Sequence, residues 1–424
     1  MNVLVNAYAC SPDMGSEPGM AWNWCVSLAR HCKLFIITEG EFRKKIETEL
    51  DNHPLKSNLQ FYYNPVSDKI RKMCWNQGNW MFYNYYKRWQ KTTLEIAKKI
   101  VKDNRIDVVH QLNMIGFREP GYLWKLKDIP FVWGPVGGIK QFPESFLSDA
   151  GLKYRLFYKL KNRLNLFQLK NSKRVDLAFK ASKAIISSIP ESKESIKKYK
   201  HYDSIIIPET GCFIDHNVNK KTYSNGKLSL IWIGKFDFRK RLDIALKTIS
   251  SLTRKKDVIL YVCGSGNENQ MTYYKKLSLD LGVGENVVWM GNIPHEQTIG
   301  LLKECDALFF TSINDDTSTV VMESISCLVP VICHDAFGFG HVVNSEVGFK
   351  IPLINQDSSV RLFAEQLDLL INNRGTLQEK SNNCIHRRQE LSWNNKADKV
   401  LSIYNEVLGG KDLKTYFFSY GTKT

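Results

Sequence analysis

The sequence predicts an α/β protein with two doubly wound parallel sheets that face each other across a cleft. Short apolar runs, suitable for buried strands, alternate with helix-length segments, and this alternation is typical of parallel sheets covered by helices. It occurs in both halves of the chain, and 424 residues are enough for two domains of about 200 residues each. With 43% hydrophobic and 24% charged residues, the composition is globular and excludes a disordered or coiled-coil chain.

The first half contains five runs that we expect to be strands. Their apolar residues favour burial on both faces of a sheet. The segment Gly19–Arg30, between the first two runs, is expected to be a helix. The expected strands are Asn2–Ala9, Leu34–Thr38, Ile106–His110, Phe131–Trp133 and Ala184–Ser187.

The second half repeats this pattern more clearly. The polar stretch 215–227, which contains the turn-forming pair Asn225-Gly226, is expected to link the halves. We therefore predict an N-terminal domain over residues 1–214 and a C-terminal domain over residues 228–390. Ligands of such sheets bind at the carboxyl ends of the strands. The expected strands are Leu228–Ile233, Val258–Cys263, Val287–Met290, Ala307–Phe310 and Val329–Cys333.

Neither export nor membrane spanning is expected from the sequence. No run of 18 apolar residues occurs, and Met1–Ala9 lacks the basic lead and long apolar segment of a signal peptide. We therefore expect a cytoplasmic protein. The ten cysteines form no C-x-x-C pair and several lie in apolar runs, so we expect small core side chains rather than zinc ligands or disulfides.

A candidate phosphate site follows the first strand of the second half. Residues Ile233–Lys240 run from the strand end through Gly234 into a helix, whose first turn offers unpaired amides and the positive end of its dipole. Lys235 and Lys240 add two cations. A glycine for close approach and charge-assisted bonds of about 1.5–3 kcal/mol each suit a diphosphate. The alternative is a solvated basic helix start.

A second candidate segment is Thr311–Glu323, which again runs from a strand into a helix. Asp315 and Asp316 suit the N-cap of a helix that is expected to begin near Thr317. Glu323 is expected about two turns into this helix, on an apolar face where a carboxylate is costly without a partner. A ribose diol would be such a partner.

Together these segments resemble the retaining glycosyltransferases of family 4, which have the GT-B fold. Lys235 and Lys240 are similar to the arginine and lysine of that family's G-R-x-x-x-x-K segment, and Asp315-x7-Glu323 resembles its E-x7-E element. The similar segments follow the family's order over nearly the whole chain. The other segments are Tyr8–Gly19, Gly134–Gly138, Cys263–Gly266, Met290–Ile293 and Val329–Ile332.

Two positions depart from the family's pattern. Lys235 stands in place of the arginine and lacks its bidentate fork, while Asp315 stands in place of the first glutamate and is one methylene shorter. Both residues keep the charge. The shorter Asp315 leaves the donor sugar open.

The resemblance implies a donor site with defined roles. Lys235 and Lys240 would hold the donor diphosphate, and Glu323 would accept hydrogen bonds from the ribose. Asp315 would bind the donor sugar, which His110 of the N-terminal domain would face. The implied catalytic residues are His110, Lys235, Lys240 and Asp315. The implied donor-binding residues are Gly15, Gly234, Lys235, Lys240, Gly264, Gly266, Asn292, Ile293, Asp315, Ser318, Thr319, Val320 and Glu323.

The resemblance also implies an acceptor side and a mechanism. A C-terminal helix, expected at Trp393–Leu408, would return to the N-terminal domain, with residues 391–424 packing on it. Retention implies attack on the face from which the nucleoside diphosphate leaves. The sequence has no D-x-D motif and no cluster with zinc spacing, so we expect no metal and no cofactor besides the nucleotide-sugar co-substrate. The implied acceptor-side residues are Ser16, Glu17, Gly137 and Gly138.

The net charge of +16 comes from the first half of the chain, where residues 1–200 hold 34 basic and 18 acidic residues. Basic residues alternate with aromatic or leucine residues at 69–99 and 153–174. Both stretches suit an anionic membrane surface. Alternatively, the apolar side chains belong to the core and the charges are solvated. Nucleic-acid binding also fits basic and aromatic residues, but no nucleic-acid module is recognised and we expect no such partner.

The sequence therefore predicts a retaining glycosyltransferase that moves a sugar from a nucleoside-diphosphate sugar to a lipid-linked or polysaccharide acceptor. The expected pathway is the synthesis of a bacterial surface glycan, such as capsule, O-antigen or exopolysaccharide. The expected location is the inner face of the plasma membrane, with peripheral attachment. The alternative is a catalytically inactive GT-B partner or scaffold protein at the membrane surface.

Overall fold

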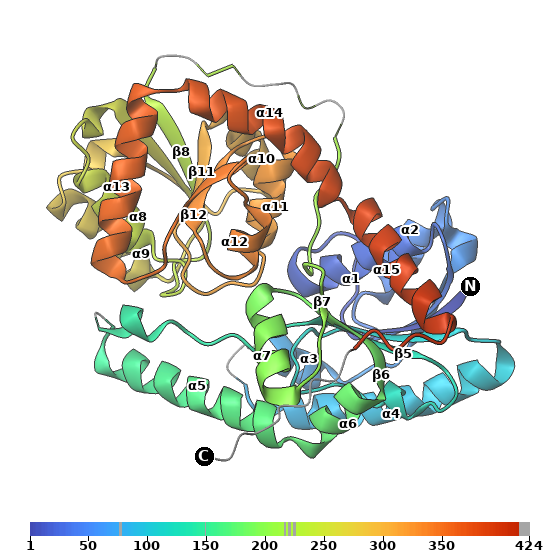
Figure 1. The fold of residues 1–424 in the computed structure, drawn as a ribbon. Helices are drawn as coiled ribbons and strands as arrows, with labels where there is room; N and C mark the ends of the chain where they lie inside the picture. The colour runs from blue at the N-terminus through green and yellow to red at the C-terminus, as the bar shows by residue number, and fades with distance from the viewer. Residues whose placement is uncertain (76–78, 149, 216–217, 219–221, 224–225, 415–424) are drawn as a thin grey trace, which may run out of the picture. The chain divides into compact units, whose positions relative to one another are not determined.

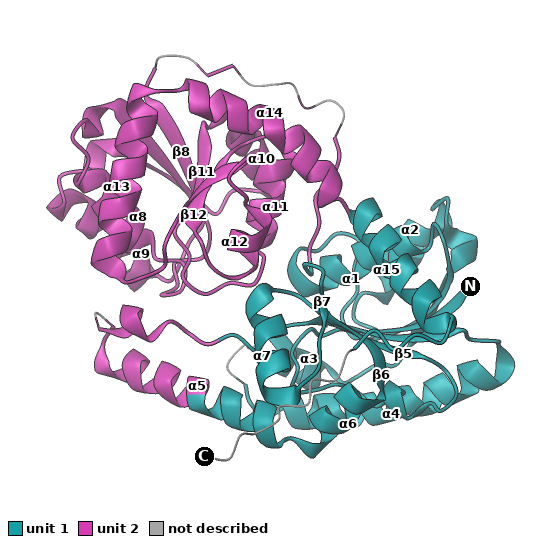
Figure 2. Ribbon diagram, viewed as in Figure 1, with its two compact units in different colours: residues 1–140, 163–209, 393–424 teal, residues 141–162, 210–392 magenta. Residues whose placement is uncertain are grey.

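The chain forms two compact units in the computed structural model, which describes residues 1–75, 79–148, 150–215, 218, 222–223 and 226–414. The N-terminal unit comprises residues 1–140, 163–209 and 393–424, and the C-terminal unit comprises residues 141–162 and 210–392. Figure 2 shows the two units in different colours. The sequence-predicted linker 215–227 lies largely outside the described residues.

The N-terminal unit is built on a parallel sheet whose described strands have the order β3-β2-β1-β4-β5-β6-β7. The order reverses between β1 and β4, as in other doubly wound sheets. The strands are β1 (Asn2–Ala7), β2 (Lys33–Thr38), β3 (Leu59–Tyr63), β4 (Val108–Asn113), β5 (Phe131–Val136), β6 (Ser182–Ser187) and β7 (Ile205–Ile206).

Helices cover both faces of this sheet. Alternate side chains of a strand point to opposite faces, and Val3 and Val5 pack with α1 and α15 while Leu4 packs with α4 and α6. Helix α15 also lies against α1 (Figure 1). The helices are α1 (Ser16–Leu28), α2 (Arg43–Asp51), α3 (Asp68–Trp75), α4 (Phe82–Asp103), α5 (Leu152–Asn171), α6 (Lys173–Ala181), α7 (Pro190–Lys200) and α15 (Trp393–Leu408).

The C-terminal unit contains a second parallel sheet, with the order β10-β9-β8-β11-β12-β13 among the described strands. Its order reverses between β8 and β11. The strands are β8 (Leu228–Ile233), β9 (Val258–Cys263), β10 (Val287–Gly291), β11 (Ala307–Phe310), β12 (Val331–His334) and β13 (Gly348–Ile351). The helices are α8 (Leu242–Ser250), α9 (Glu268–Asp280), α10 (His295–Glu304), α11 (Thr319–Ser326), α12 (Phe337–Val342), α13 (Gln356–Asn372) and α14 (Gly375–Glu390).

The division of the chain differs from the sequence-based one at residues 141–162. The sequence placed them in the domain 1–214, whereas the structure groups them with the C-terminal unit. The reason is packing, because Phe142, Phe146 and Leu147 are buried in the core of that unit. The ring of Phe142 stacks on Phe238 at a centroid distance of 6.0 Å. Helix α5 therefore begins in one unit and ends in the other (Figure 2).

His110, which the resemblance implies would face the donor sugar, has no exposed surface in the structure. It lies within β4 and is fully buried. Its Nε2 lies 2.6 Å from the carbonyl oxygen of Gly134, and its Nδ1 lies 2.5 Å from the hydroxyl of Tyr404 on α15. Since a carbonyl only accepts, Nε2–H donates to Gly134 and Tyr404 donates to Nδ1. Both ring nitrogens are therefore used to tie the sheet to α15.

Burial lowers the pKa of His110 to about 4, which makes the free energy of unfolding depend on pH. The unfolded chain takes up this proton near the ordinary histidine pKa of about 6.5, whereas the folded chain resists it until about pH 4. The contribution is thus complete above pH 6.5 and is lost as the pH falls towards 4. We expect His110→Gln to reduce this slope by up to about 1.4 kcal/mol per pH unit.

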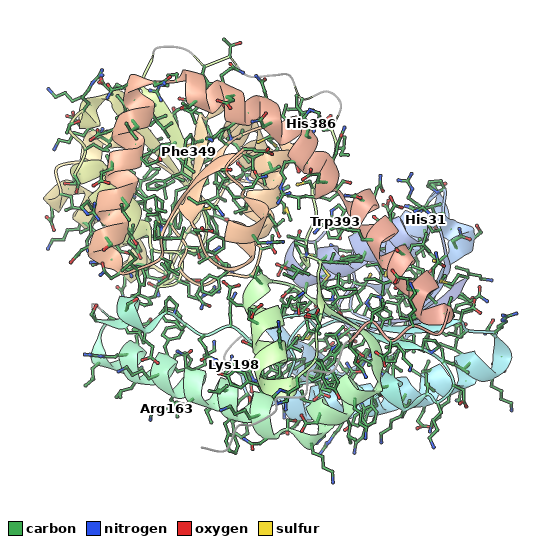
Figure 3. The ribbon with its side chains drawn as sticks, viewed as in Figure 1. His31, Arg163, Lys198, Phe349, His386 and Trp393 are labelled. Carbon is green, nitrogen blue, oxygen red and sulfur yellow. The ribbon has the colours of Figure 1, made fainter. Side chains whose placement is uncertain are left out.

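The measurement is urea denaturation between pH 4 and 7. His386, an exposed histidine on α14 that Figure 3 labels, provides the control, and His386→Gln should leave the slope as it is. Burial also lowers the pKa of His334 to about 3, so His110→Gln should retain part of the acid sensitivity. An unaltered slope in His110→Gln would contradict this account.

Candidate functional site

A cavity of about 370 Å³ opens at the carboxyl ends of β8, β9 and β10 in the C-terminal unit. It is formed by the three loops that leave these strands, together with one side chain of α10. This edge is where parallel sheets bind ligands. The lining residues are Ile233, Gly234, Lys235, Cys263, Gly264, Ser265, Gly291, Asn292, Ile293 and Thr298.

Backbone hydrogen bonds hold these loops together. The amide of Gly234 donates to Cys263 at 3.0 Å, and the amide of Gly264 donates to Gly291 at 2.7 Å. Gly264 has a φ of +140°, which an L-residue rarely adopts. A Cβ atom there would lie 1.8 Å from the carbonyl oxygen of Gly234. The glycine is thus required for two loops of the cavity to approach each other.

Lys240 and Asp315 form an ion pair beside this cavity. The Nζ of Lys240 lies 2.7 Å from Oδ2 of Asp315, and each side chain is only 15% exposed. The hydroxyl of Ser312 donates to the same oxygen at 2.6 Å. A Cβ on Gly234 would lie 3.5 Å from the Lys240 side chain, so the lysine stem borders the cavity lining. The pair joins the loop after β8 to the loop after β11.

Arg239 is a further cation of this site that the sequence analysis did not select. Its guanidinium lies 2.7 Å from Asp237 and 3.6 Å from Asp315. Its carbonyl oxygen accepts from the amide of Ile313 at 2.8 Å. In the sequence, only the position next to Lys240 pointed to Arg239. Three successive basic residues after a strand do not show which of their side chains turn towards the same carboxylate.

Glu323 lies nearer to the start of its helix than the sequence predicted. Helix α11 begins at Thr319, so Glu323 is little more than one turn from the N-terminus, not two. Its Oε1 lies 2.8 Å from Nε2 of His295 on α10. Thr298, which lines the cavity, belongs to the same helix as His295. Glu323 therefore contacts α10, the helix that contributes Thr298 to the cavity.

The N-terminus of α11 carries three more of the predicted donor-binding residues. Ser318 is the N-cap residue, with a φ of +73°, and it is followed by Thr319 and Val320. The first turn holds no acidic residue and offers amides that lack intrahelical partners. Asp315, which also suited an N-cap in the sequence, pairs instead with Lys240.

The predicted acceptor-side residues gather at the carboxyl ends of β1, β4 and β5 in the N-terminal unit. The amide of Ile115 donates to Oε1 of Glu17 at 3.3 Å, and the amide of Gly137 donates to the carbonyl of Ile115 at 2.8 Å. Gly15 is the N-cap of α1, and Ser16 begins that helix with a φ of +57°. Glu17 and Gly137 are thus brought together through one loop residue.

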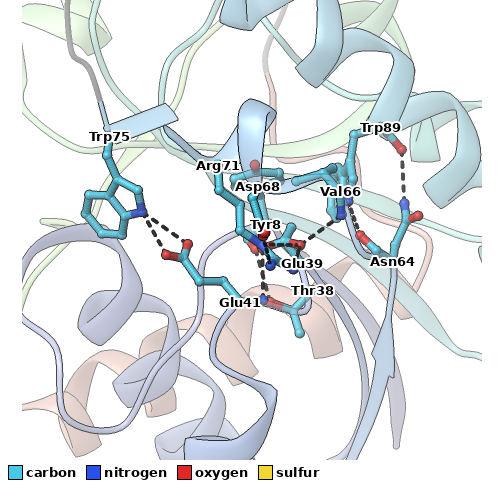
Figure 4. Close-up of polar contacts among 10 residues, drawn as sticks. All are labelled: Tyr8, Thr38, Glu39, Glu41, Asn64, Val66, Asp68, Arg71, Trp75 and Trp89. Atoms are coloured by element: carbon cyan, nitrogen blue, oxygen red, sulfur yellow. Dashed lines mark hydrogen bonds and ion pairs between the residues drawn. The ribbon is translucent and has the colours of Figure 1, made fainter. Parts of the chain in front are cut away.

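A buried carboxylate supports this same edge of the sheet, as Figure 4 shows. Glu39 follows β2 and is 4% exposed. Its Oε1 accepts from Arg71 at 2.9 Å and from the amide of Val66 at 2.9 Å. The nearby Trp75 indole donates to Glu41 at 2.9 Å. These contacts attach α3 to the end of β2. The sequence does not reveal these contacts, because Glu39 and Arg71 are 32 residues apart.

Most of the predicted site residues thus fall into two groups, while His110 lies buried in β4. Within the C-terminal unit, five of the predicted donor-binding residues line one cavity, namely Gly234, Lys235, Gly264, Asn292 and Ile293. Lys240 borders this lining and pairs with Asp315. Gly266 follows the lining residue Ser265, and a Cβ there would lie 2.4 Å from the side chain of Gln270. Within the N-terminal unit, Gly15, Ser16, Glu17, Gly137 and Gly138 share one sheet edge. Across the described part of the chain, acidic, histidine and cysteine side chains form no group of three that could hold a metal ion.

Comparison with known proteins connects the cavity to a protein family. Residues 214–390 match the family model described as glycosyl transferases group 1. This stretch is a group 1 glycosyltransferase domain. It contains every residue that lines the cavity, together with Lys240, Asp315 and Glu323.

Two curated relatives match the same share of the chain. An uncharacterized glycosyltransferase of Methanocaldococcus jannaschii is 23% identical over 185 residues, which cover 42% of this chain and 46% of the relative. The D-inositol 3-phosphate glycosyltransferase of Corynebacterium diphtheriae is 21% identical over 184 residues, or 42% of each protein. The matches thus span less than half the length of these relatives.

Solved structures resemble the chain over nearly its full length. Anabaena HepE in complex with UDP has a TM-score of 0.60 at 12% identity and covers 96% of this chain and 100% of its own. WaaG, a glycosyltransferase involved in lipopolysaccharide biosynthesis, has a TM-score of 0.58 at 16% identity, with 95% and 99% covered. Sucrose-phosphate synthase from Thermosynechococcus elongatus has a TM-score of 0.64 at 13% identity, with 97% and 100% covered. The fold with two Rossmann-like sheets is therefore the GT-B fold.

The Gly264 contact gives a test of how the group 1 domain builds its cavity. We expect Gly264→Ala to destabilise the protein by at least about 1–3 kcal/mol, the usual cost of an unfavourable backbone conformation, because the methyl group would also overlap Gly234. Gly300→Ala, at a helical position with nothing within 4 Å of a Cβ, should instead stabilise it by up to about 1 kcal/mol. Urea denaturation measures both, and equal stabilities would refute the assigned contact.

Proposed function

We propose that the protein is a retaining glycosyltransferase that transfers a sugar from a nucleoside-diphosphate sugar to an acceptor of a bacterial surface glycan. The observation that carries the proposal is the Lys240–Asp315 pair beside a cavity at the carboxyl ends of the strands of a group 1 domain. Lys235 lines the cavity itself. The complexes of HepE with UDP and the role of WaaG in lipopolysaccharide biosynthesis support the choice of donor and pathway.

The chemistry follows from the charges that surround the cavity. As the bond to the anomeric carbon breaks, negative charge grows on the leaving diphosphate. Lys235, Lys240 and the amides at the start of α11 would stabilise that charge more strongly in the transition state than in the bound donor. The acceptor hydroxyl would attack on the face from which the diphosphate leaves and would give its proton to that phosphate. In this scheme cations and helix dipoles supply the charge that a metal ion would otherwise provide.

The two carboxylates would divide the binding of the donor. Glu323, now paired with His295, would accept hydrogen bonds from the ribose hydroxyls. Asp315 would bind hydroxyls of the transferred sugar while Lys240 turns to the diphosphate. The ion pair would hold both side chains in place before the donor arrives, so that neither has to be ordered during binding.

A lipid-linked acceptor fits the surface of α5. The leucines and phenylalanine of its apolar stripe are 48–63% exposed, which excludes the alternative that they form a core. Basic residues flank the stripe and would each contribute about 1 kcal/mol at an anionic surface. Peripheral attachment at the inner face of the plasma membrane would follow. The stripe residues are Leu156, Leu160, Leu164 and Phe167, and the basic residues are Lys153, Lys159, Lys161, Arg163 and Lys170.

The second predicted membrane segment, residues 69–99, is largely part of the core. Phe82, Tyr86 and Trp89 are buried in a cluster with Tyr8, as the alternative explanation of this segment required. Trp75 and Trp80 remain exposed, while residues 76–78 lie outside the described part. We therefore assign the main membrane contact to α5. No helix among the described residues is long and apolar enough to cross a bilayer.

Loss of the Lys240 charge tests the proposal. We expect Lys240→Met, which keeps most of the stem, to bind nucleoside diphosphates at least about tenfold more weakly, since a charge-assisted hydrogen bond is worth about 1.5–3 kcal/mol. The measurement is thermal stabilisation by UDP, GDP and ADP and their sugars, where ligand at a hundred times its dissociation constant adds about 2.7 kcal/mol in the wild type.

Two variants complete this test. Lys276→Met removes an exposed lysine of α9 in the same unit and should bind like the wild type. Lys240→Met with Asp315→Asn removes the pair without leaving an unpaired acid, which separates loss of binding from loss of stability. If no nucleoside diphosphate bound the wild-type protein, the inactive GT-B scaffold would be the better interpretation.

The α5 surface gives a separate prediction. We expect Leu160→Asp to reduce sedimentation with vesicles that contain phosphatidylglycerol by several-fold, because it places a charge in the apolar stripe. Leu279→Asp alters a leucine of α9 that is 70% exposed and should sediment like the wild type. Binding of wild-type protein should also fall as salt is added. Equal binding of both variants would remove α5 from the membrane contact.

A further inference from the structure

We propose that Arg118 binds a phosphate group of the acceptor, next to the acceptor-side loop of the N-terminal unit. The inference rests on the proposed function, because it names the chemical class of that acceptor. Arg118 lies in the loop that follows β4, at the same sheet edge as Glu17 and Gly137. Its guanidinium lies over the buried ring of Phe117, 5.0 Å from the centroid.

Helix α5 holds Arg118 with two carboxamides. The Nε of Arg118 donates to Oε1 of Gln168 at 2.6 Å, and its NH2 group donates to Oδ1 of Asn165. Asn165 is 5% exposed, and its own amide donates to the carbonyl of Gly138 at 3.1 Å and to that of Lys140 at 3.2 Å. One asparagine therefore fixes the guanidinium against the predicted acceptor loop, with some of its N–H groups left for a ligand.

The charges around Arg118 favour an anion. The neighbouring residue in the sequence, Glu119, forms an ion pair with Arg174, which donates two hydrogen bonds to the carboxylate. Burial raises the pKa of Glu119, and the charges of Arg174 and of Lys87 on α4 oppose this rise. Among the residues that the structure describes, Arg118 forms no ion pair with a carboxylate. Arg174 and Lys87 thus both act on Glu119, whereas the partly buried Arg118 has only neutral hydrogen-bond partners.

The burial of Arg118 favours the binding of an anionic ligand. It lowers the pKa of Arg118 below its ordinary value, so the charged form pays for lost hydration that the carboxamides only partly replace. A phosphate offers a planar guanidinium two parallel hydrogen bonds. Tyr83 lies near the guanidinium of Arg118, since the charge of Arg118 opposes the rise in the pKa of Tyr83.

The same helix connects this cation with the apolar surface. Asn165 and Gln168, which hold Arg118, each follow directly after a residue of the exposed stripe, Leu164 and Phe167. A phosphate bound to Arg118 would therefore lie within about one helix diameter, 10–12 Å, of that stripe. This arrangement fits an acceptor whose phosphate joins the sugar to an apolar chain. A soluble phosphorylated acceptor shares the phosphate but has no use for the stripe.

Calorimetric titration of the full chain with hexyl phosphate, inorganic phosphate and hexanol tests the proposal. We expect hexyl phosphate to bind the wild type, and hexanol to bind at least tenfold more weakly. Arg118→Gln should weaken hexyl phosphate binding by about tenfold or more, the usual effect of losing a charge-assisted hydrogen bond. Gln168→Glu keeps the side-chain shape but gives Arg118 a carboxylate partner, and it should weaken binding to a similar extent.

The controls separate this site from the donor site. Arg30→Gln removes an exposed arginine elsewhere in the N-terminal unit and should bind hexyl phosphate like the wild type. Arg118→Gln should bind nucleoside diphosphates as tightly as the wild type does. If the wild-type protein bound no nucleoside diphosphate, that result would contradict the proposed function but not the Arg118 site. Hexyl phosphate that binds more tightly than inorganic phosphate assigns the phosphate to a lipid, and equal affinities assign it to a soluble acceptor. Unchanged hexyl phosphate affinity in both Arg118→Gln and Gln168→Glu would overturn the proposal.

Discussion

The geometry of the group 1 domain depends on one ion pair between loops that are far apart in the sequence. Lys240 and Asp315 are separated by 75 positions, yet their contact joins the loop after β8 to the loop after β11. Thr311 strengthens the join, since its hydroxyl contacts the carbonyl oxygens of Lys240 and Arg241, each at 2.9 Å. Removing one partner of a pair with so little exposure is costly, because it leaves the other charge without compensation. The pair therefore keeps both side chains ordered and holds the two loops together.

Most of the fold could be predicted from the sequence because buried parallel strands are apolar on both faces. The structure confirms the bounds of β8, β9 and β11 and places the other predicted strands within a few residues. The unpredicted strands β3, β7 and β13 are all edge strands, where fewer side chains are buried and the apolar signal is weaker. The unit to which residues 141–162 belong could not be predicted. Apolar residues such as Phe146 indicate that the segment is buried, but they do not indicate against which sheet.

The candidate site was easiest to predict where residues follow directly after strands. Gly234, Gly264 and Asn292 leave the ends of neighbouring strands, and parallel pairing alone brings such positions together. His110 shows the limit of this reasoning, because the last predicted position of a strand proved to lie inside the sheet. Side-chain contacts between distant segments left no signal in the sequence, and the hydrogen bond between Arg118 and Asn165 is an example. Neither a carboxamide nor an arginine reveals its partner by spacing.

The assignment of residues 141–162 to the C-terminal unit means that the chain passes from one unit to the other four times. Neither unit is a continuous piece of polypeptide. On a ribosome, the first unit cannot be completed until α15 has been synthesised, although its sheet is finished some two hundred residues earlier. The second unit likewise receives Phe142 and Phe146 long before its own strands exist. Assembly of the two lobes is therefore coupled during synthesis, and the gene offers no single point at which one lobe could be exchanged for another.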